Sequence, residues 1–362
     1  MKEQNVVIFH DFLIERGGGE RVVLCLASFF KALIVTCFYD RTKTYKEFEN
    51  LSIIAGTSAR LAKIRPAKLL KAFIFFSKQL KGKRNFFSKN FDKALFSGFY
   101  SIYFSKFISL PKFYYIQAEP LSFVFKRSSY GSLRFSVYRA FYKVIKNIEK
   151  EAIKSMDCVV ANSNYTKRLY EKTFSIKVRR VIYPPVNVSK FYFKEYGDFY
   201  LAVGRLYPHK RIHLVAKVFA QLRSEKLVIV GDGPLRKFIE RVARDYKNIT
   251  YLGSVSDRKL RELYAECKAV IYIPEKEHFG IIPIEANAAG KPAIVSNEGG
   301  LPEAIINKKT GIVINRPYSS SLRKVILNFS TYKFSKQSCI KNARRFEKRN
   351  FLLQFHKLLD EN

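Results

Sequence analysis

Residues 277–292 read EHFGIIPIEANAAGKP, and two glutamates, Glu277 and Glu285, stand eight positions apart in this stretch. A glycine lies between them. The residues after it predict a helix that carries Glu285 on its first turns and leaves Glu277 on the preceding loop. Amides at a helix start suit phosphate, and carboxylates suit the hydroxyls of a sugar or a ribose. The stretch therefore predicts a site for a nucleotide-sugar.

The chain on either side of this stretch alternates short apolar segments with segments of helical pattern. Such alternation predicts parallel sheets with helices on both faces. In the second half, strands are predicted at 199–203, 227–230, 249–252, 269–273 and 293–296, with helices at 212–223 and up to residue 245. In the first half, strands are predicted at 6–9, 34–38, 94–97, 114–117 and 158–161, with a helix after Gly19. The predicted fold class is α/β, with two doubly wound domains that face a cleft.

Residues 181–186, which read VIYPPV, interrupt the alternation. Two consecutive prolines prevent a helix and favour an extended linker. We therefore expect a first domain over residues 1–183 and a second over residues 184–341. The segment 342–359 has an amphipathic helical pattern, so residues 342–362 are expected to form a C-terminal helix.

The composition is that of a globular protein. Of the 362 residues, 48% are hydrophobic, which is enough for packed cores. The five cysteines are scattered without a CxxC pair and are predicted to be free thiols in a reducing compartment.

The N-terminus shows no secretory signal. Residues 22–39 are almost wholly apolar and long enough for a membrane span, but Lys31 interrupts them. A buried helix to about residue 30 and a strand at 32–38 are therefore expected.

The charge is extreme and uneven. The formal net charge is +36, and residues 51–150 hold 20 basic residues but only 3 acidic ones. Two stretches, 60–93 and 126–150, interleave lysine and arginine with phenylalanine and tyrosine. Such stretches are typical of proteins that bind an anionic membrane surface. The same pattern also suits nucleic acid, which we consider unlikely, or an ordinary solvated basic face.

A glycine-rich turn follows the first predicted strand. Residues 16–20 read RGGGE, and the backbone amides of Gly17 and Gly18 could approach an anion closely at the start of the next helix. The spacing is not that of the GxGxxG fingerprint, so a dinucleotide site is not predicted. Many glycine-rich turns are only tight connections.

Two later turns also combine glycine with charged groups after a predicted strand. Residues 204–210 read GRLYPHK, and Arg205 and Lys210 could clamp a diphosphate just after Gly204. Taken alone, each cation would more often be an ordinary surface charge. Residues 296–303 read SNEGGLPE and give another turn with free amides, or only a connection between a strand and a helix.

Together these segments resemble the retaining glycosyltransferases of the GT-B fold, family 4, also described as glycosyl transferases group 1. The resemblance covers essentially the whole chain. Its segments are VGRLYPHK at 203–210, VIVGDGPL at 228–235, YLG at 251–253, ANSNYT at 161–166, VIYPPV at 181–186 and the glutamate stretch at 277–292. Residues 10–13, HDFL, with the triple glycine, resemble the mannosyltransferase-like branch of this family.

The resemblance implies two Rossmann-like domains that face a cleft. Residues 1–183 would bind the acceptor and residues 184–341 the nucleotide-sugar donor, and the C-terminal helix would pack back toward the first domain. Arg205 and Lys210 would neutralise the donor diphosphate. Glu285 would hold the ribose hydroxyls and Glu277 the transferred sugar, so the implied catalytic residues are Arg205, Lys210 and Glu277.

The resemblance also implies backbone groups that face the donor. They are those of Gly17, Gly18, Gly204, Gly280, Ile281 and Ile282. The chain contains no Asp-x-Asp motif. No metal ligand and no cofactor are therefore expected, and the cations and amides would replace a metal ion.

One position departs from the family pattern. Family members usually carry a histidine on the loop after the strand that holds residues 114–116, whereas this chain has Gln117-Ala118-Glu119-Pro120. Gln117 can donate a hydrogen bond but has no imidazole. Gln117 and Glu119 are therefore the candidates on the acceptor side, and Glu119 is also compatible with an ordinary loop glutamate.

We expect a cytoplasmic, metal-independent retaining hexosyltransferase of glycan biosynthesis, peripheral on the inner face of a membrane. It would move mannose or glucose from a donor such as GDP-mannose or UDP-glucose to a hydroxyl of a glycan or lipid-linked glycan. Two alternatives stay open. One is a GT-B sugar-nucleotide epimerase, and the other is a non-catalytic basic protein that binds a membrane or nucleic acid.

Overall fold

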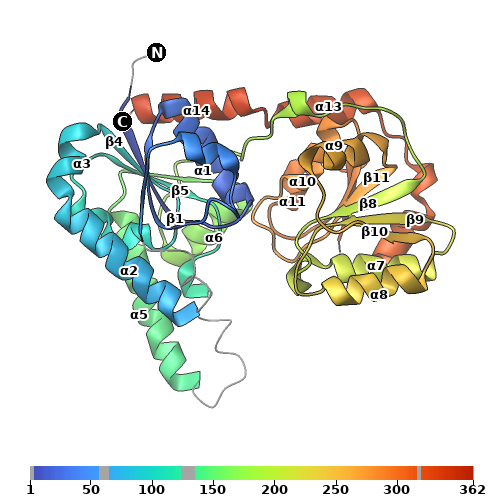
Figure 1. Ribbon diagram of the computed structural model, residues 1–362, viewed down its shortest axis with the longest axis horizontal. Coiled ribbons are helices and arrows are strands. Elements are labelled where there is room, and N and C mark those ends of the chain that lie inside the picture. Colours follow the sequence, from blue (N-terminus) through green and yellow to red (C-terminus); the bar gives the residue numbers. More distant parts are fainter. Residues whose placement is uncertain (1–3, 57–64, 124–134, 316–318, 362) are drawn as a thin grey trace. The chain divides into compact units, whose positions relative to one another are not determined.

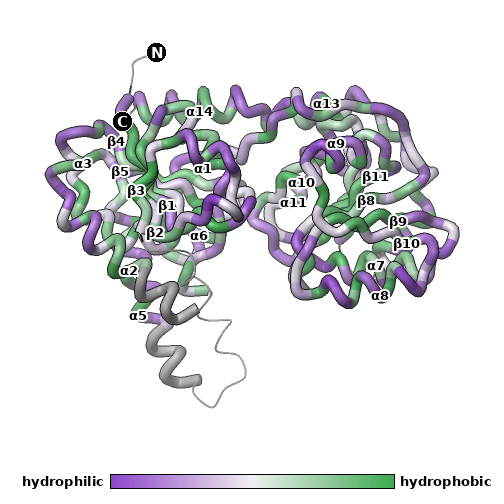
Figure 2. The backbone as a smooth tube through the Cα atoms, viewed as in Figure 1, coloured by the Kyte–Doolittle hydropathy of each residue, from purple (hydrophilic) through white to green (hydrophobic). Residues whose placement is uncertain are grey.

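The computed structural model describes residues 4–56, 65–123, 135–315 and 319–361 (Figure 1). The chain divides into two compact units. Unit 1 comprises Met1–Tyr183 and Phe351–Asn362, and unit 2 comprises Pro184–Asn350. In both units the apolar residues concentrate on the strands and the polar ones on loops and outer helix faces (Figure 2).

Unit 1 is built on a seven-stranded sheet whose pairings are all parallel. The order is β3-β2-β1-β4-β5-β6-β7. The strands are β1 (Val6–Leu13), β2 (Leu33–Tyr39), β3 (Ile53–Ala55), β4 (Lys93–Phe96), β5 (Lys112–Ile116), β6 (Cys158–Ala161) and β7 (Arg180–Val181). The strand order reverses between β1 and β4, and ligands of open α/β sheets bind at the carboxyl ends of strands at such a point.

Both faces of the unit 1 sheet are covered. Val6 and Ile8 of β1 pack with α1 (Gly18–Phe30) and α14 (Lys348–Asp360), whereas Val7 and Phe9 pack with the opposite cluster. The opposite cluster includes residues of α2 (Arg65–Gly82), α3 (Arg84–Asn90), α5 (Phe135–Lys154) and α6 (Asn164–Phe174). Alternate side chains of a strand point to opposite faces, which gives the two cores. Short 3-10 helices, η1 (Lys46–Asn50) and η3 (Ser101–Phe107), complete the unit.

Unit 2 repeats this plan with six parallel strands in the order β10-β9-β8-β11-β12-β13. The strands are β8 (Phe199–Val203), β9 (Lys226–Val230), β10 (Ile249–Tyr251), β11 (Ala269–Tyr272), β12 (Ala293–Ser296) and β13 (Gly311–Ile314). The order reverses between β8 and β11. The prediction of two doubly wound sheets is therefore confirmed.

Helices cover both faces of this second sheet as well. Tyr200 and Ala202 of β8 pack in one apolar cluster, and Leu201 and Val203 in the other. The helices are α7 (Ile212–Gln221), α8 (Arg236–Asp245), α9 (Asp257–Glu266), α10 (Ile282–Ala288), α11 (Leu301–Ala304), α12 (Ser319–Leu327) and α13 (Lys336–Arg344), with 3-10 turns η4 (Val188–Lys190), η5 (Pro208–Lys210) and η6 (Phe329–Thr331).

The C-terminal segment corrects one prediction. One helix was expected over 342–359, but α13 ends at Arg344 and α14 begins at Lys348. The backbone between them bonds to the linker instead, because Val186 N donates to Phe346 O at 2.8 Å and Lys348 N donates to Val186 O at 3.1 Å. The helix that packs with unit 1 is thus α14, through residues such as Phe355, whose ring lies 5.1 Å from that of Tyr115.

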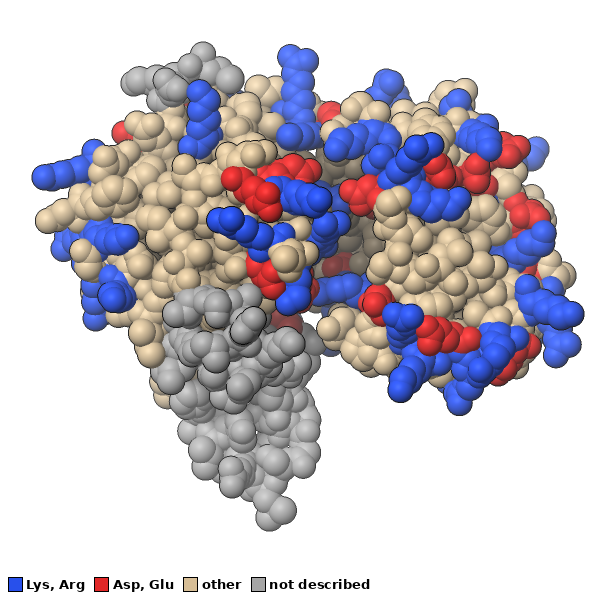
Figure 3. Space-filling model, viewed as in Figure 1, with Lys and Arg blue, Asp and Glu red and all other residues tan. Residues whose placement is uncertain are grey.

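The apolar segment 22–39 forms a helix and a strand, as predicted. Helix α1 ends at Phe30, Lys31 adopts a left-handed conformation at its C-cap, and β2 begins at Leu33. Among the helices that the structure describes, none is long and apolar enough to cross a membrane. Lysine and arginine side chains are spread over the visible face of both units (Figure 3). The parts of the two basic stretches at 60–64 and 126–134 lie outside the described residues.

Candidate functional site

The loop after β8 is locked to the loop after β9. Gly204 N donates to Val230 O at 3.0 Å, and Leu206 N donates to Asp232 O at 2.8 Å. Gly231 has φ +137°, and a Cβ there would lie 1.9 Å from Gly204 O. Only glycine fits such a close backbone contact. The glycine-containing loops after β8 and β9 therefore pack together at the carboxyl ends of these neighbouring strands.

Lys210 and Glu277 form the centre of the candidate site. Lys210 Nζ lies 2.5 Å from Glu277 Oε2, and both side chains are largely shielded from solvent. Tyr272 joins them, because its hydroxyl donates to Glu277 Oε2 at 3.0 Å and lies 3.4 Å from Lys210 Nζ. The two loops also meet through their backbones, since Glu275 N donates to His209 O at 2.7 Å. Two residues predicted separately are thus brought into direct contact.

This contact sets the protonation of Glu277. Burial alone would raise the pKa of its carboxyl group, but the charge and hydrogen bond of Lys210, together with the Tyr272 hydroxyl, lower that pKa below its ordinary value. Burial raises the pKa of Tyr272, so its hydroxyl keeps its proton. At neutral pH Glu277 is therefore a carboxylate and Tyr272 a neutral phenol.

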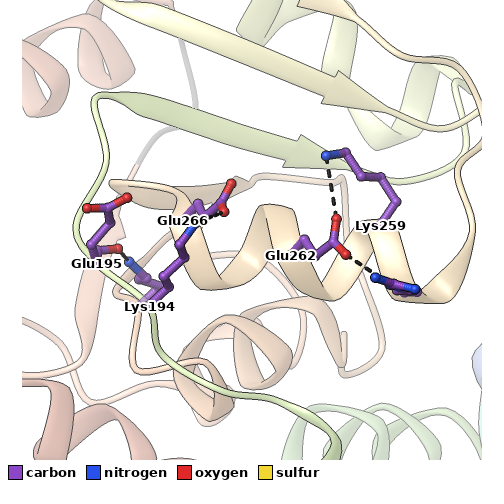
Figure 4. Close-up of polar contacts among 7 residues, drawn as sticks. Lys194, Glu195, Lys259, Glu262 and Glu266 are labelled. Atoms are coloured by element: carbon purple, nitrogen blue, oxygen red, sulfur yellow. Dashed lines mark hydrogen bonds and ion pairs between the residues drawn. The ribbon is translucent and has the colours of Figure 1, made fainter.

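The Lys210–Glu277 pair differs from the ion pairs at the surface of unit 2. Figure 4 shows Lys194 with Glu266, at 2.7 Å, and Lys259 with Glu262, at 3.6 Å, around α9. The lysines of these pairs are about half exposed, whereas Lys210 is only 12% exposed. Exposed pairs of this kind contribute little to stability, because water and salt screen them. The shielded pair is the one suited to act on a bound charge.

The turn at 299–300 fixes the backbone of Glu277. Gly300 N donates to Glu277 O at 2.8 Å. Gly299 has φ +68°, and a Cβ there would lie only 1.9 Å from Glu277 O. The segment 296–303, which the sequence predicted only as a turn or a connection, therefore directly supports the glutamate stretch.

Glu285 lies on the first turn of α10, as the sequence predicted, and Glu277 lies on the loop before it. The Glu285 side chain is 6% exposed, and Tyr264 OH donates to its Oε2 at 2.9 Å. Gly280 and Ile281 directly precede α10, and Ile282 is its first residue. The structure thus places both carboxylates and this helix start on one continuous segment.

Arg205 differs from Lys210 in its surroundings. Its side chain is exposed, and its guanidinium lies 5.6 Å from the centre of the Tyr207 ring. Its charge opposes the effect of burial on the pKa of Tyr272, so it acts on the same group of residues as Lys210. A neighbouring ion pair that we did not predict joins Arg211 Nη1 to Glu298 Oε1 at 3.0 Å.

In unit 1 the glycine-rich turn forms the start of α1. Gly17 is the N-cap, and Gly18 is the first helical residue. Arg21 N and the Tyr45 hydroxyl both donate to Gly17 O, at 3.1 and 3.3 Å. A Cβ on Gly18 would meet no atom within 4 Å. Open space at this helix start is compatible with the predicted approach of an anion.

Gln117 lies where the carboxyl ends of β1, β4 and β5 meet. Its side-chain Nε2 donates to Ser97 Oγ at 2.5 Å, and its backbone carbonyl oxygen accepts from Asn162 Nδ2 at 3.0 Å. His10 Nδ1 lies 2.7 Å from Ser97 O. Glu119 follows on the same loop and is partly buried. The structure therefore joins Gln117 to His10 through Ser97.

Two buried carboxylates of unit 1 bind backbone amides. Asp11 accepts hydrogen bonds from the amides of Phe99, Tyr100 and Ser101, at the start of η3. Glu149 accepts from the amides of the loop after β5. The sequence reasoning missed this role of Glu149, although a glutamate amid apolar and basic residues on a helical segment was a usable signal.

Solved structures with the same architecture cover the whole chain. HepE of Anabaena in complex with UDP superposes with a TM-score of 0.76 at 16% identity, covering 99% of this chain and 100% of that one. Sucrose-phosphate synthase of Thermosynechococcus elongatus gives 0.76 at 17% identity, over 99% and 98%. The fold is therefore that of the GT-B glycosyltransferases.

The sequence of unit 2 is similar to a known family. Residues 188–346 match the family described as glycosyl transferases group 1. Mouse alpha-1,3/1,6-mannosyltransferase ALG2 is 29% identical over 215 residues, which are 50% of this chain and 52% of that protein. The Dictyostelium discoideum protein of the same name is 23% identical over 394 residues, 90% of each chain. The mouse match thus spans about half of that relative.

Proposed function

We propose that this protein transfers a mannosyl residue from GDP-mannose to a hydroxyl group of a glycan or lipid-linked glycan, with retention of anomeric configuration and without a metal ion. The observation that carries the proposal is the shielded contact of Lys210 with Glu277 and Tyr272 at the carboxyl end of the unit 2 sheet. The mouse and Dictyostelium relatives are named mannosyltransferases, which supports mannose as the transferred sugar. UDP-glucose is the second candidate donor, since HepE is known in complex with it.

The reaction places a defined electrostatic task on these residues. The bond between the anomeric carbon and the diphosphate oxygen breaks, the acceptor oxygen bonds to that carbon, and the acceptor hydroxyl loses its proton. Negative charge grows on the departing diphosphate. Lys210 and Arg205 would offset that charge, and groups held in place before the reaction act most strongly in a shielded site.

The two glutamates take separate parts in this proposal. Glu277, ionised beside Lys210, would accept hydrogen bonds from hydroxyls of the transferred sugar. Glu285, on the first turn of α10, would accept from the ribose hydroxyls. The backbone around Gly280, Ile281 and Ile282 and the turn at Gly204 would line the donor phosphates.

A transfer assay tests the proposal. The protein is incubated with GDP-mannose or UDP-glucose and with octyl α-mannoside as a simple acceptor, with and without EDTA, and the products are identified by mass spectrometry. We expect one hexose to be added from GDP-mannose at a rate that EDTA leaves unchanged, and NMR of the product should show an α linkage. Loss of activity in EDTA would contradict metal independence, and a β linkage would contradict retention.

The same assay distinguishes the enzymatic alternative. An epimerase would convert the nucleotide-sugar without any acceptor. We expect GDP-mannose alone to be consumed only slowly, by transfer to water. Rapid formation of an isomeric nucleotide-sugar without acceptor would replace the proposed function with epimerisation.

We also propose that unit 1 binds an anionic membrane surface as a peripheral protein on the cytoplasmic side. Helices α2 and α5 both pack on η3. They expose Ile74, Val144 and Ile148, which are 58%, 53% and 51% exposed, beside basic residues that include Lys78, Lys81 and Lys143. Aliphatic side chains among lysines suit the interface of an anionic bilayer.

Vesicle co-sedimentation tests this part. The protein should sediment with vesicles of phosphatidylglycerol and phosphatidylcholine but not with phosphatidylcholine alone, and salt should weaken binding. Ile148→Glu should reduce binding, while Leu327→Glu, at a position 55% exposed in unit 2, should not. If Ile148→Glu and Leu327→Glu bound vesicles equally well, α5 would not be part of the membrane-binding surface. Steeply salt-dependent binding to duplex DNA without vesicle binding would favour the nucleic-acid alternative.

A further inference from the structure

Glu149 is a buried carboxylate whose two oxygens each bind one backbone amide. It lies on α5 and is 0% exposed. Leu121 N donates to its Oε1 at 2.8 Å, and Ser122 N donates to its Oε2 at 3.1 Å. Hydrogen bonds to an ionised carboxylate are shorter and stronger than those between neutral groups. The side chain therefore binds the first two amides of the helical turn at residues 121–123, which follows the 117–120 loop and is about 28 positions away in sequence.

The clamped loop is the one that begins with Gln117. At its start, Gln117 is held by Ser97 and Asn162. At its end the chain enters a helical turn at residues 121–123, where Phe123 N donates to Pro120 O at 3.0 Å. Glu119 lies between these two anchored points. The loop therefore has one anchor at the sheet and a second anchor on α5.

The second anchor is energetically demanding. Burial raises the pKa of the Glu149 carboxyl group, and the two amides only partly oppose that effect. An apolar side chain would fill the same place without the need to desolvate a charge. A buried carboxylate is thus better explained by the backbone geometry that it fixes than by packing.

We propose that Glu149 is a positioning residue for the acceptor: it holds the loop 117–122 so that Gln117 and Glu119 are presented to the acceptor hydroxyl, without itself touching the acceptor. This inference rests on the proposed function, because the acceptor side of unit 1 is defined by it. It predicts that acceptor binding depends on Glu149 while donor binding in unit 2 does not.

Two variants and a matched control test this role. Glu149→Ala removes both acceptor oxygens, and Glu149→Gln keeps one of them. The control is Glu151→Gln, since Glu151 lies on the same helix but its side chain is 69% exposed and pairs only at the surface with Lys154, at 3.2 Å. Hydrogen–deuterium exchange is measured on peptides that cover residues 117–123, and KM is measured for octyl α-mannoside and for GDP-mannose.

We expect exchange in residues 117–123 to rise about tenfold or more in Glu149→Ala and less in Glu149→Gln, because one or both charge-assisted bonds are lost. The KM for octyl α-mannoside should rise about tenfold, while the KM for GDP-mannose stays within about twofold. Glu151→Gln should match the wild type in every measurement.

The outcomes separate this inference from the proposed function. A loop that stays protected in both variants, or an unchanged acceptor KM in a folded Glu149→Gln protein, overturns the inference. If Glu149→Ala does not fold, Glu149→Gln decides. If the wild type transfers no hexose to octyl α-mannoside, the proposed acceptor is wrong, and unchanged exchange in Glu149→Gln still overturns the clamp.

Discussion

Unit 1 and unit 2 share a doubly wound plan but use their acidic side chains differently. In unit 1, Asp11 and Glu149 are buried and accept hydrogen bonds from backbone amides. In unit 2, Glu277 is bound by the side chains of Lys210 and Tyr272. A carboxylate bound to amides fixes the shape of a loop, whereas one bound to side chains can exchange partners with a ligand.

The protonation of these groups follows the same division. Burial raises the pKa of Asp11 and of Glu149 above the ordinary value. In Glu277 the effect of burial is outweighed by Lys210 and Tyr272, and the pKa is lowered. The comparison therefore favours a structural task for Asp11 and Glu149 and a binding task for Glu277.

The largest expected effect is on catalysis in unit 2. Glu277→Gln and Lys210→Met should each reduce kcat/KM for GDP-mannose by about a hundredfold or more, because each removes a preorganised charge from the donor site. The control is Lys268→Met, since Lys268 also pairs with a glutamate of unit 2, Glu225, at 3.0 Å. Steady-state kinetics of hexose transfer measures the effect. If both site variants transferred hexose at the wild-type rate, the proposed catalytic role of Lys210 and Glu277 would be wrong.

The next effect is on the stability of unit 1. Asp11→Asn should lower the free energy of unfolding by about 2 kcal/mol, because buried amides at residues 99–101 lose an ionised partner. Chemical denaturation measures it. The affinity for GDP-mannose of the folded variant should stay within twofold of the wild type. If Asp11→Asn kept its full stability but lost much of its affinity for GDP-mannose, Asp11 would have a binding task and not a structural one.

A smaller effect separates two glycines of unit 2. Gly299 and Gly253 both have left-handed φ, +68° and +66°, so alanine should cost about 1 kcal/mol at either position. A Cβ at Gly253 meets nothing within 4 Å, whereas one at Gly299 overlaps Glu277 O. Gly299→Ala should therefore lower the free energy of unfolding by at least about 1 kcal/mol more than Gly253→Ala does, because displacement of the backbone adds to the strain. Chemical denaturation measures this difference. Equal costs would show that the 299–300 turn does not support Glu277.

The smallest effect is on the pH dependence of stability, and its sign differs between the units. The lowered pKa of Glu277 contributes stability above the ordinary value of 4.5, which is lost as pH falls through the folded pKa. The raised pKa of Glu149 acts in the opposite sense, because the folded state binds the proton more tightly and acidification relieves the cost of burial.

Denaturation of two variants between neutral and acid pH measures this difference. Relative to the wild type, Glu277→Gln should be most destabilised at neutral pH and approach the wild type on acidification. Glu149→Gln should show a difference from the wild type that grows on acidification. We expect the change in Glu277→Gln to be below about 1 kcal/mol, because 22% of the Glu277 side chain is still exposed to screening by water. If the stability difference from the wild type changed in the same direction with pH in both variants, the contrast between Glu277 and Glu149 would be contradicted.

The sequence predicted the strands and helices of both units well, because their patterns are local. The strands Phe199–Val203, Cys158–Ala161 and Ala293–Ser296 match their predicted bounds, and the break after Tyr183 coincides with the division into units. The strands Ile53–Ala55 and Gly311–Ile314 and the helices Asp257–Glu266 and Ser319–Leu327 were not predicted. The C-terminal segment was predicted wrongly. Its helical pattern continues through residues 345–347, but hydrogen bonds to Val186, far away in sequence, interrupt the helix.

The candidate site was predictable as a set of residues but not as a set of contacts. Local motifs identified Lys210, Glu277 and Glu285 separately. They did not indicate that Lys210 and Glu277 would pair, because the pair joins two loops 67 positions apart. The partners Tyr272 and Tyr264 come from strand β11 and helix α9, where a tyrosine reads as core. Only the packing of the elements determines such neighbours.

Donor binding to unit 2 tests the central claim most directly. Isothermal titration calorimetry of GDP-mannose should give saturable binding to the wild type. The Kd should rise at least about tenfold in Lys210→Met, since this variant loses the shielded charge that we propose for the diphosphate. Lys268→Met should bind as the wild type does. Equal affinity of Lys210→Met and the wild type, with both proteins folded, would contradict a donor site built around the Lys210–Glu277 pair.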